Sequence, residues 1–559
     1  MTLPRSLPAS IRVAAGLSGL MCAQAAYGSD PTAGQPQSDA ARQTSAPPVA
    51  DRSEMDPASP FEEWNEILDG FLDEEQGGPS SVPPVEDSGW LDEHLRLSGS
   101  TSLGVSYNVI PHYATVGPNS DAAAGIPGTY FGNIQRLRAR GDLQADFILP
   151  FNMRARLQAF GFYDFAFLIH GRDRYTEEVL QDYELQGEVL DFWVAGSWGP
   201  HLDFKLGRQV VNWGRSDTLR VTDVINALNN REPGLTDIEN LRLPSTMARI
   251  DAYWEKFSVT LLVIPEIRYD YDPPPGNDFF PAFDIRDIPY PPADSPLTRD
   301  ELAALLAASA AAAFAKNPPS LRAPQWGAAP ELGLSLSGIF RGWDLSIYLA
   351  RLYQNRTTLI INLPSPTEGG LFTDDDLVTL IGAGGNYTWG RWLFKAEAAW
   401  IDELDYVYLS PRETWTPSAP IPAYELIRNR FSRLDWMLGV EYYGFSRVMI
   451  ALELAHRHVF DYAPALQYLP NYIYGDNVEV ALRVTSEHFN GRLRPTLLTL
   501  LLANEQGFAG GTLRLSADYE FAEGLIGTLG YLHFFGSEQL PFNTWDQNNR
   551  LFGKFKYSF

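Results

Sequence analysis

A run of charged and amide side chains follows a short strand-like segment at Leu206–Asn230, which reads LGRQVVNWGRSDTLRVTDVINALNN. Guanidinium, carboxylate and amide groups at this spacing can attract, repel and orient small polar solutes through charge and hydrogen bonds. The side chains that carry this chemistry are Arg208, Gln209, Arg215, Asp217, Arg220 and Asp223. We interpret them as candidates for a selective polar site, with a solvated loop of turn-forming residues as the alternative.

Segments with a period of two surround this run. RLRARGDLQADF alternates polar with apolar residues, and so do TLRLSADYEF, LFKAEAAW and NVEVALRVT. The charged positions of the predicted strands include Arg136, Arg138, Arg140, Arg154, Arg156, Lys395, Glu397, Glu479 and Arg483. A strand with one face toward lipid and the other toward a polar lumen shows this alternation over about ten residues. The segments therefore predict transmembrane strands whose charged side chains line the lumen.

Short and long connections alternate along the chain. Tight turns fall at 149–152, 198–201, 255–257, 341–342, 389–391, 444–446, 490–492 and 522–524, with longer polar or proline-rich segments between them. Periplasmic turns and extracellular loops alternate in this way in outer-membrane barrels. Eight turns join sixteen strands, and one strand at each end makes eighteen. We predict an all-β transmembrane antiparallel barrel over 93–559 with 18 strands, or 16 as second choice. A β-solenoid would need a fixed repeat period, which we do not find.

Both ends of the chain indicate export to the outer membrane. Residues 1–25 resemble a secretory signal peptide, with basic Arg5 and Arg12, the apolar run VAAGLSGLM and a small-residue cleavage site. We expect Cys22, the single cysteine, to be removed with it. The final segment, RLFGKFKYSF, alternates aromatic residues with lysine and ends on Phe559, as in strands recognised by the barrel-assembly machinery. We expect that machinery and outer-membrane lipid as partners, in the outer membrane of a Gram-negative cell.

Residues 26–92 form an acidic lead before the barrel. Between residues 29 and 92 there are 15 Asp and Glu against two Arg, so this segment holds −13 of the net charge of −26. That balance argues against nucleic acid as a partner. Most of the lead has the composition of a disordered chain. Apolar residues at helical spacing predict a short amphipathic helix at 61–75. Trp64 and Phe71 are its candidate anchors for a periplasmic partner, and a loosely docked helix is the alternative.

The largest loop insertion spans 273–328 and is first proline-rich, then alanine-rich. Thr298 and Glu301 form a capping-box pair ahead of the alanine run, which predicts a helix. We expect either a surface helix on the extracellular loops or a lid over the pore.

The predicted barrel places the run at Leu206–Asn230 at the end of the fifth strand and in the third extracellular loop. There it is either solvated or folded inward as a constriction. Arg208 breaks the alternation, and an arginine facing lipid is costly, so a bulge turns it inward or it lies at the headgroup level. We expect Trp213 in the interfacial aromatic belt. The lumen arginines either pair with wall carboxylates or favour an anionic solute.

The same run carries a family resemblance. Gly207–Gln209, followed after three residues by Trp213 and Gly214, resembles the signature of an uncharacterised proteobacterial outer-membrane barrel family. The Asn-Pro-Leu-Asp-like tetrad of that family is altered here to Asn-Ala-Leu-Asn at 226–229. Members are often encoded beside resistance-nodulation-division exporters. The resemblance implies transport of a lipid-like molecule in concert with a periplasmic or inner-membrane exporter.

Three functions are open from the sequence. The first is a transport barrel for a hydrophobic or amphiphilic molecule, and the second is a diffusion porin for small polar or anionic solutes. The third is an outer-membrane hydrolase or adhesin that the barrel anchors. We expect no enzyme activity, cofactor or metal, because the sequence offers no nucleophile motif or metal-ligand spacing. His456 and His458 are expected at the extracellular end of a strand, and Asp374–Asp376 in an acidic loop.

Overall fold

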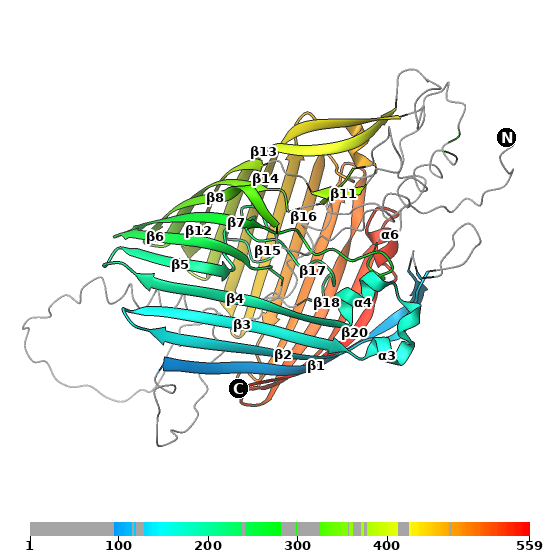
Figure 1. The fold of residues 1–559 in the computed structure, drawn as a ribbon, viewed down its shortest axis with the longest axis horizontal. Coiled ribbons are helices and arrows are strands. Elements are labelled where there is room, and N and C mark those ends of the chain that lie inside the picture. Colours follow the sequence, from blue (N-terminus) through cyan, green and yellow to red (C-terminus); the bar gives the residue numbers. More distant parts are fainter. Residues whose placement is uncertain are drawn as a thin grey trace, which may run out of the picture. The chain divides into compact units, whose positions relative to one another are not determined.

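A closed ring of eighteen antiparallel strands forms the fold (Figure 1). The ring follows the chain from β1 to β9, continues from β12 to β20, and closes where β20 pairs with β1. The computed structural model describes residues 94–114, 117–118, 128–236, 241–280, 298, 301, 325–355, 357–360, 370–373, 377–411, 424–468 and 472–559. The predicted signal peptide and acidic lead lie outside these residues, with Trp64 and Phe71, and so does most of 273–328. The prediction of 18 strands is confirmed.

The strands have the following bounds: β1 Leu95–Tyr113, β2 Tyr130–Leu149, β3 Met153–Asp164, β4 Leu185–Ser197, β5 Leu202–Gln209, β6 Ser245–Trp254, β7 Phe257–Ile267, β8 Gln325–Phe340, β9 Trp343–Tyr353, β10 Thr357–Ile360, β11 Gly370–Thr373, β12 Leu377–Trp389, β13 Trp392–Pro411, β14 Tyr424–Phe445, β15 Val448–Val459, β16 Asp476–Ser486, β17 Leu493–Asn504, β18 Gly507–Ala522, β19 Leu525–Gly536 and β20 Arg550–Ser558. The short helical segments are α3 Ala166–His170, η2 Arg172–Arg174, α4 Glu177–Tyr183, η5 Pro464–Gln467 and α6 Phe542–Trp545. The β10–β11 hairpin lies outside the ring. Each predicted tight turn joins two consecutive strands of the wall. In the described part of the chain, no helix is long and apolar enough to cross a membrane.

The wall has an apolar outer face and an inner face that is partly polar. On β9, Leu345, Ile347 and Leu349 are 51%, 51% and 43% exposed, whereas the alternate positions Ser346 and Tyr348 are buried. Large apolar side chains exposed at every second residue fit a surface that lipid covers. The period of two seen in the sequence therefore gives the correct faces of the wall.

Exposed aromatic side chains gather at the tight turns. They are Phe151, Trp198, Trp254, Trp389, Phe445, Phe489 and Phe521. Aromatic rings at one end of a barrel mark the membrane interface, where an apolar ring can meet water and headgroups. Trp213 does not belong to this belt: it is 6% exposed and packs against Tyr348, with ring centroids 5.2 Å apart. The expectation for Trp213 was wrong because the loop that carries it folds into the barrel.

Gly207 interrupts the alternation of β5. Its φ of 125° is unfavourable for an L side chain, and a Cβ there would overlap the Phe192 carbonyl oxygen on β4. Beyond it, Arg208 turns toward the lumen, where its guanidinium donates to Glu266 and Glu188 at 3.0 Å each. Of the two expectations for Arg208, the inward orientation holds.

The wall closes between the first and last strands. Gly99 N donates to Phe559 O, and Phe559 N donates to Gly99 O, both at 2.9 Å. The terminal segment that resembles an assembly signal is therefore the strand that completes the ring. Recognition by the assembly machinery itself stays a prediction.

We expect Gly207→Ala to lower the free energy of unfolding by about 2 kcal/mol or more, because the new methyl group adds backbone strain and a steric overlap. Urea unfolding in lipid vesicles measures this loss. Gly141→Ala is the matched control, since Gly141 on β2 has no heavy atom within 4 Å of the position of an added Cβ. Equal unfolding midpoints for the two variants would contradict the role assigned to Gly207.

Candidate functional site

The segment 210–244, which we call the crossing loop, passes through the lumen. In its second half, Glu232 accepts hydrogen bonds from Arg138 of β2 at 3.1 and 3.3 Å. In its first half, Ser216 N and Thr222 N donate to Glu397 of β13. β13 lies half-way round the ring from β2 in either direction. A segment that binds both strands must cross the barrel, so the inward position considered from the sequence is the observed one.

Two wall carboxylates hold the loop backbone. Glu453 of β15 accepts from three consecutive amides, Asp217 N at 2.8 Å, Thr218 N at 3.0 Å and Leu219 N at 2.8 Å. Glu397 accepts from Ser216 N at 2.6 Å, from Thr222 N at 3.1 Å and from Thr222 Oγ1 at 2.8 Å, and also from Arg215 N. Glu397 and Glu453 are 4% and 3% exposed. Successive N–H groups that converge on one carboxylate stabilise a buried negative charge.

Gly214 explains how the loop comes so close to the wall. Its φ is 101°, and a Cβ there would lie 2.8 Å from Thr222 Oγ1 and 2.9 Å from Glu397 Oε1. Only glycine leaves room for the carboxylate at this position. On the preceding residue, the Trp213 ring lies against Gly333 of β8, where an added Cβ would be 2.8 Å from the indole. The Trp213–Gly214 pair therefore fits the loop to two parts of the wall.

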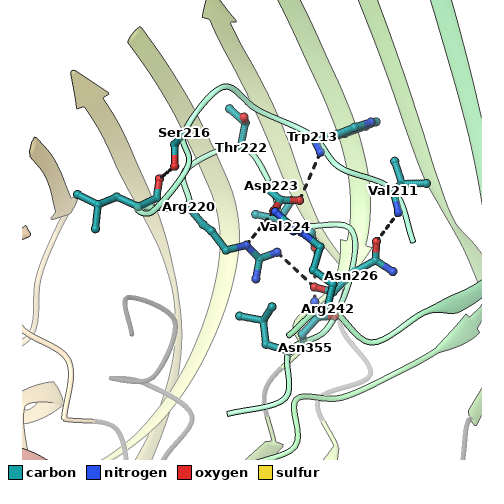
Figure 2. Close-up of polar contacts among 12 residues, drawn as sticks. Val211, Trp213, Ser216, Arg220, Thr222, Asp223, Val224, Asn226, Arg242 and Asn355 are labelled. Atoms are coloured by element: carbon teal, nitrogen blue, oxygen red, sulfur yellow. Dashed lines mark hydrogen bonds and ion pairs between the residues drawn. The ribbon is translucent and has the colours of Figure 1, made fainter. Parts of the chain in front are cut away.

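Polar contacts within the loop fix its shape (Figure 2). Asp223 accepts from Arg220 Nε at 3.0 Å and from Arg242 at 2.7 and 2.9 Å. Asn226 Oδ1 accepts from Val211 N at 2.8 Å, and Asn226 Nδ2 donates to Leu243 O at 2.9 Å. Burial acts to raise the pKa of Asp223, but Arg220 and Arg242 outweigh it and keep that pKa below its usual range. Arg220 and Asp223 thus stabilise the fold of the loop.

Asp217 reaches two cations on different strands. Its Oδ2 accepts from Lys395 Nζ of β13 at 2.7 Å and from Arg483 of β16 at 2.8 Å. Lys395 also pairs with Glu441 of β14. The side chains of Lys395 and Arg483 are 6% and 9% exposed, but that of Asp217 is 34% exposed. The ion pairs therefore lie at the margin of the contact between loop and wall.

Arg457 links the loop to a further acidic cluster. It donates to Glu479 at 2.8 Å, to Asp435 at 2.9 Å and to the Arg220 carbonyl oxygen at 2.8 Å. Arg215 extends the other way and donates to Ser346 Oγ of β9 at 2.7 Å, with Asp344 at 2.9 Å. The loop thus meets charged or hydroxyl side chains on β9, β13, β15 and β16.

The remaining predicted side chains divide into two groups. Arg136 and Arg138 pair with Glu232 of the crossing loop, and Gln209 is fully buried at its start. The other arginines stay with the wall. Arg140 pairs with Asp142 at 2.6 Å, Arg156 pairs with Asp146 at 2.7 Å, and Arg154 is exposed near the β2–β3 turn.

The arginines of β2 also stack on aromatic rings. The Arg138 and Arg140 guanidinium carbons lie 4.1 Å from the ring centroids of Phe162 and Phe160, respectively. Such stacking orients a guanidinium without neutralising it.

For Glu232, burial acts to raise the pKa, but Arg136 and Arg138 hold it well below its usual range. The carboxylate therefore stays ionised and keeps this part of the loop bound to β2.

A second segment also enters the lumen. After β7, residues 268–280 pair with the crossing loop, since Tyr271 N donates to Leu228 O and Asn230 N donates to Tyr271 O, both at 2.8 Å. Farther along, Phe279 is buried against Phe534 and Trp545. The start of the predicted 273–328 insertion thus lies inside the barrel, and its possible lid lies outside the described residues. At Thr298 and Glu301 the capping-box contacts are present.

Titratable groups elsewhere in the described ranges do not suggest a metal centre. No group of three or more His, Cys, Asp or Glu there is arranged to hold a metal ion. His456 and His458 both contact Asp476 Oδ1, at 2.9 and 2.8 Å, near the end of β15 that is distant from the β14–β15 turn. Asp374–Asp376 lie outside the described residues.

The sequence analysis did not single out the anchors of the loop. Lys395, Glu397 and Arg483 were recognised as lumen-facing positions, but neither they nor Glu453 were assigned to the crossing loop. The sequence signal for these anchors is that charged residues occupy the lumen-facing positions near the middle of the strands. A small uncharged residue would be enough there if the position only had to face the lumen.

We expect Glu453→Gln to loosen the loop, because a carboxamide offers one oxygen to three N–H donors and places its own NH₂ group near them. Hydrogen bonds to charged groups contribute about 1.5–3 kcal/mol, so exchange at 217–219 should accelerate by about tenfold or more. Hydrogen–deuterium exchange followed by mass spectrometry measures it. Glu520→Gln on β18 removes a wall carboxylate away from the loop as control. Unchanged exchange in Glu453→Gln would show that the carboxylate does not hold the loop.

Three solved structures illustrate what the chain is similar to. OccAB1 of Acinetobacter baumannii is 10% identical, with a TM-score of 0.45, covering 85% of this chain and 98% of that one. OccD3 (OpdP) of Pseudomonas aeruginosa is 11% identical, with a TM-score of 0.42, covering 84% and 91%. OmpF of Salmonella typhi, in complex with daunomycin, is 9% identical, with a TM-score of 0.36, covering 83% and 97%. No curated protein matches the chain. Residues 130–559 match the family described as "Protein of unknown function (DUF1302)", so the chain belongs to that family, and its described residues form a closed antiparallel β-barrel.

Proposed function

We propose that this barrel is a channel for small polar solutes, narrowed by the crossing loop. The observation that carries the proposal is the binding of the loop backbone by Glu397 and Glu453 on the wall opposite β2. A loop held across the lumen reduces the open cross-section and makes solutes pass beside its charges. Channel selectivity follows from such charges at close range.

The charge pattern around the loop supports a polar solute. On one side Arg136 and Arg138 face the lumen, and on the other Lys395 and Arg483 do so, each with carboxylates nearby. Charges of both signs at a constriction orient a dipolar or charged solute and exclude an apolar one, which would have to displace their water. A diffusion porin of narrow bore therefore accounts for the site better than an apolar conduit.

A second candidate is transport of a lipid-like molecule, and one observation favours it. Apolar side chains occupy lumen-facing positions on several strands, among them Leu262, Leu380, Leu498 and Leu500. Here they pack with apolar residues of the crossing loop, but they would offer an apolar path if the loop moved. The family resemblance adds an exporter partner, with Trp64 and Phe71 as docking anchors. The hydrolase alternative is tested by a serine-reactive probe, and a probe that labels nothing would exclude it.

Single-channel conductance in planar bilayers tests the proposed channel. We expect the intact protein to give a small, steady, ion-selective conductance. Replacing 214–222 by a glycine–serine linker of equal length should enlarge that conductance and weaken its selectivity, because the contacts that hold the loop across the lumen are lost. The same replacement at the exposed 487–491 turn is the control and should leave both unchanged.

Two outcomes would go against the channel. A conductance that ignores the 214–222 replacement would mean that the loop does not set the pore. A barrel that stays silent until 273–328 is deleted, and that retains bound lipid on purification, would favour the amphiphile transporter instead.

A further inference from the structure

We infer that Lys395 and Arg483 form a binding subsite for a small carboxylate solute, and that Asp217 of the crossing loop occupies this subsite as an internal competitor. The inference rests on the proposed channel and names its solute class. The two cations come from β13 and β16, which are separated in the ring by β14 and β15, yet both reach a single oxygen, Asp217 Oδ2. Two buried donors converging on one oxygen provide the geometry of a carboxylate site.

The two cations of the subsite lie on strands of the wall, whereas the anion that they bind lies on the crossing loop. Lys395 and Arg483 are 7% exposed each and have fixed positions on β-strands, which makes them a preorganised pair. Asp217 lies on a loop, and a third of its side-chain surface is exposed. A solute arriving through the lumen can therefore approach the carboxylate from its open side and compete for the same donors.

The site stabilises an anion in spite of the acidic groups around it. Glu441 pairs with Lys395, and the Glu453 and Glu397 carboxylates lie on the same part of the wall. Burial acts to raise the pKa of Asp217, but Lys395 and Arg483 outweigh it, so that pKa lies below its usual range. Glu397 and Glu453 are compensated by loop amides, so Arg483 pairs with Asp217 and Lys395 is shared between Asp217 and Glu441. The carboxylate of a solute in place of Asp217 would experience the same electrostatic potential from these groups.

The tethered aspartate sets the affinity for a free solute. A competitor attached to the loop has an effective concentration of about millimolar or more, so a solute binds only to the fraction of molecules whose subsite is vacant. Removing the aspartate charge weakens this competitor and raises the fraction of molecules whose subsite is vacant. Apparent affinity for a carboxylate should then rise, although the binding groups are unchanged.

The test is succinate binding to the folded, detergent-solubilised full chain, followed by thermal stabilisation and by titration calorimetry. We expect Asp217→Asn to bind succinate about tenfold more tightly than the wild type, as loss of one competing charge-assisted contact predicts. In planar bilayers the same variant should shift its reversal potential toward anion selectivity and be blocked at lower succinate concentration.

Two variants separate a subsite from a general loss of charge. Asp223→Asn removes a carboxylate of the same loop that pairs with Arg220 and Arg242, not with the wall, and should not gain succinate affinity. Asp217→Asn combined with Arg483→Gln should lose the gain, and Arg483 has Asp217 as its ion-pair partner, so the change strands no other acid. Heat-modifiable migration on gels verifies that each variant is folded.

The outcomes are distinguishable. Equal succinate affinity in the wild type and Asp217→Asn would overturn the subsite, as would a gain that persists without Arg483 or that Asp223→Asn reproduces. Absence of conductance in all variants, together with tighter succinate binding by Asp217→Asn, would refute the channel and leave the subsite standing.

Discussion

The structure depends on the pairing of buried carboxylates with backbone amides inside the barrel. Glu397 and Glu453 would be costly in the lumen wall without partners, since a buried charge must be compensated by hydrogen bonds or counter-charges. The amides of 215–219 would be equally costly if they were buried and unpaired. The carboxylates accept hydrogen bonds from these amides, so neither partner is buried without a hydrogen bond. These hydrogen bonds hold an irregular segment across the lumen.

This pairing gives the barrel an internal core. The outer face of the wall meets lipid, so packing against other protein groups has to occur on the lumen side. Trp213, Leu219 and Val221 of the loop are buried with Leu262, Tyr348 and Leu380 of the wall. Polar contacts hold the loop where its backbone reaches the wall, and apolar side chains of the loop and the wall pack in the space between these contacts. Because polar and apolar contacts both hold the loop, its charged residues that face the open part of the lumen can keep fixed positions. A channel needs charges at fixed positions to select between solutes.

Much of the wall was predictable from the sequence, and much of the site was not. The period of two around Arg138 and the alternation of short and long connections identify strands, faces and turns, because these depend on neighbours in the chain. Arg208 and Asp217 were identified as candidates from their types and place in the third loop. Their partners were not, because Glu266, Lys395 and Arg483 lie far along the chain and a period of two says only that they face the lumen. Trp213 was misplaced for the same reason: an aromatic residue near a strand end suits a membrane belt and an internal core equally well.

The spacing between the loop and its anchors has a consequence for assembly. The contacts at Arg215, Asp217 and Arg483 span 182, 236 and 266 residues, and they join the first half of the ring to the second. Contacts this distant in the chain form late, after the intervening strands have found their neighbours. The crossing loop can therefore make these contacts only once β13, β15 and β16 have formed, so its position depends on strands that follow it by half the length of the barrel.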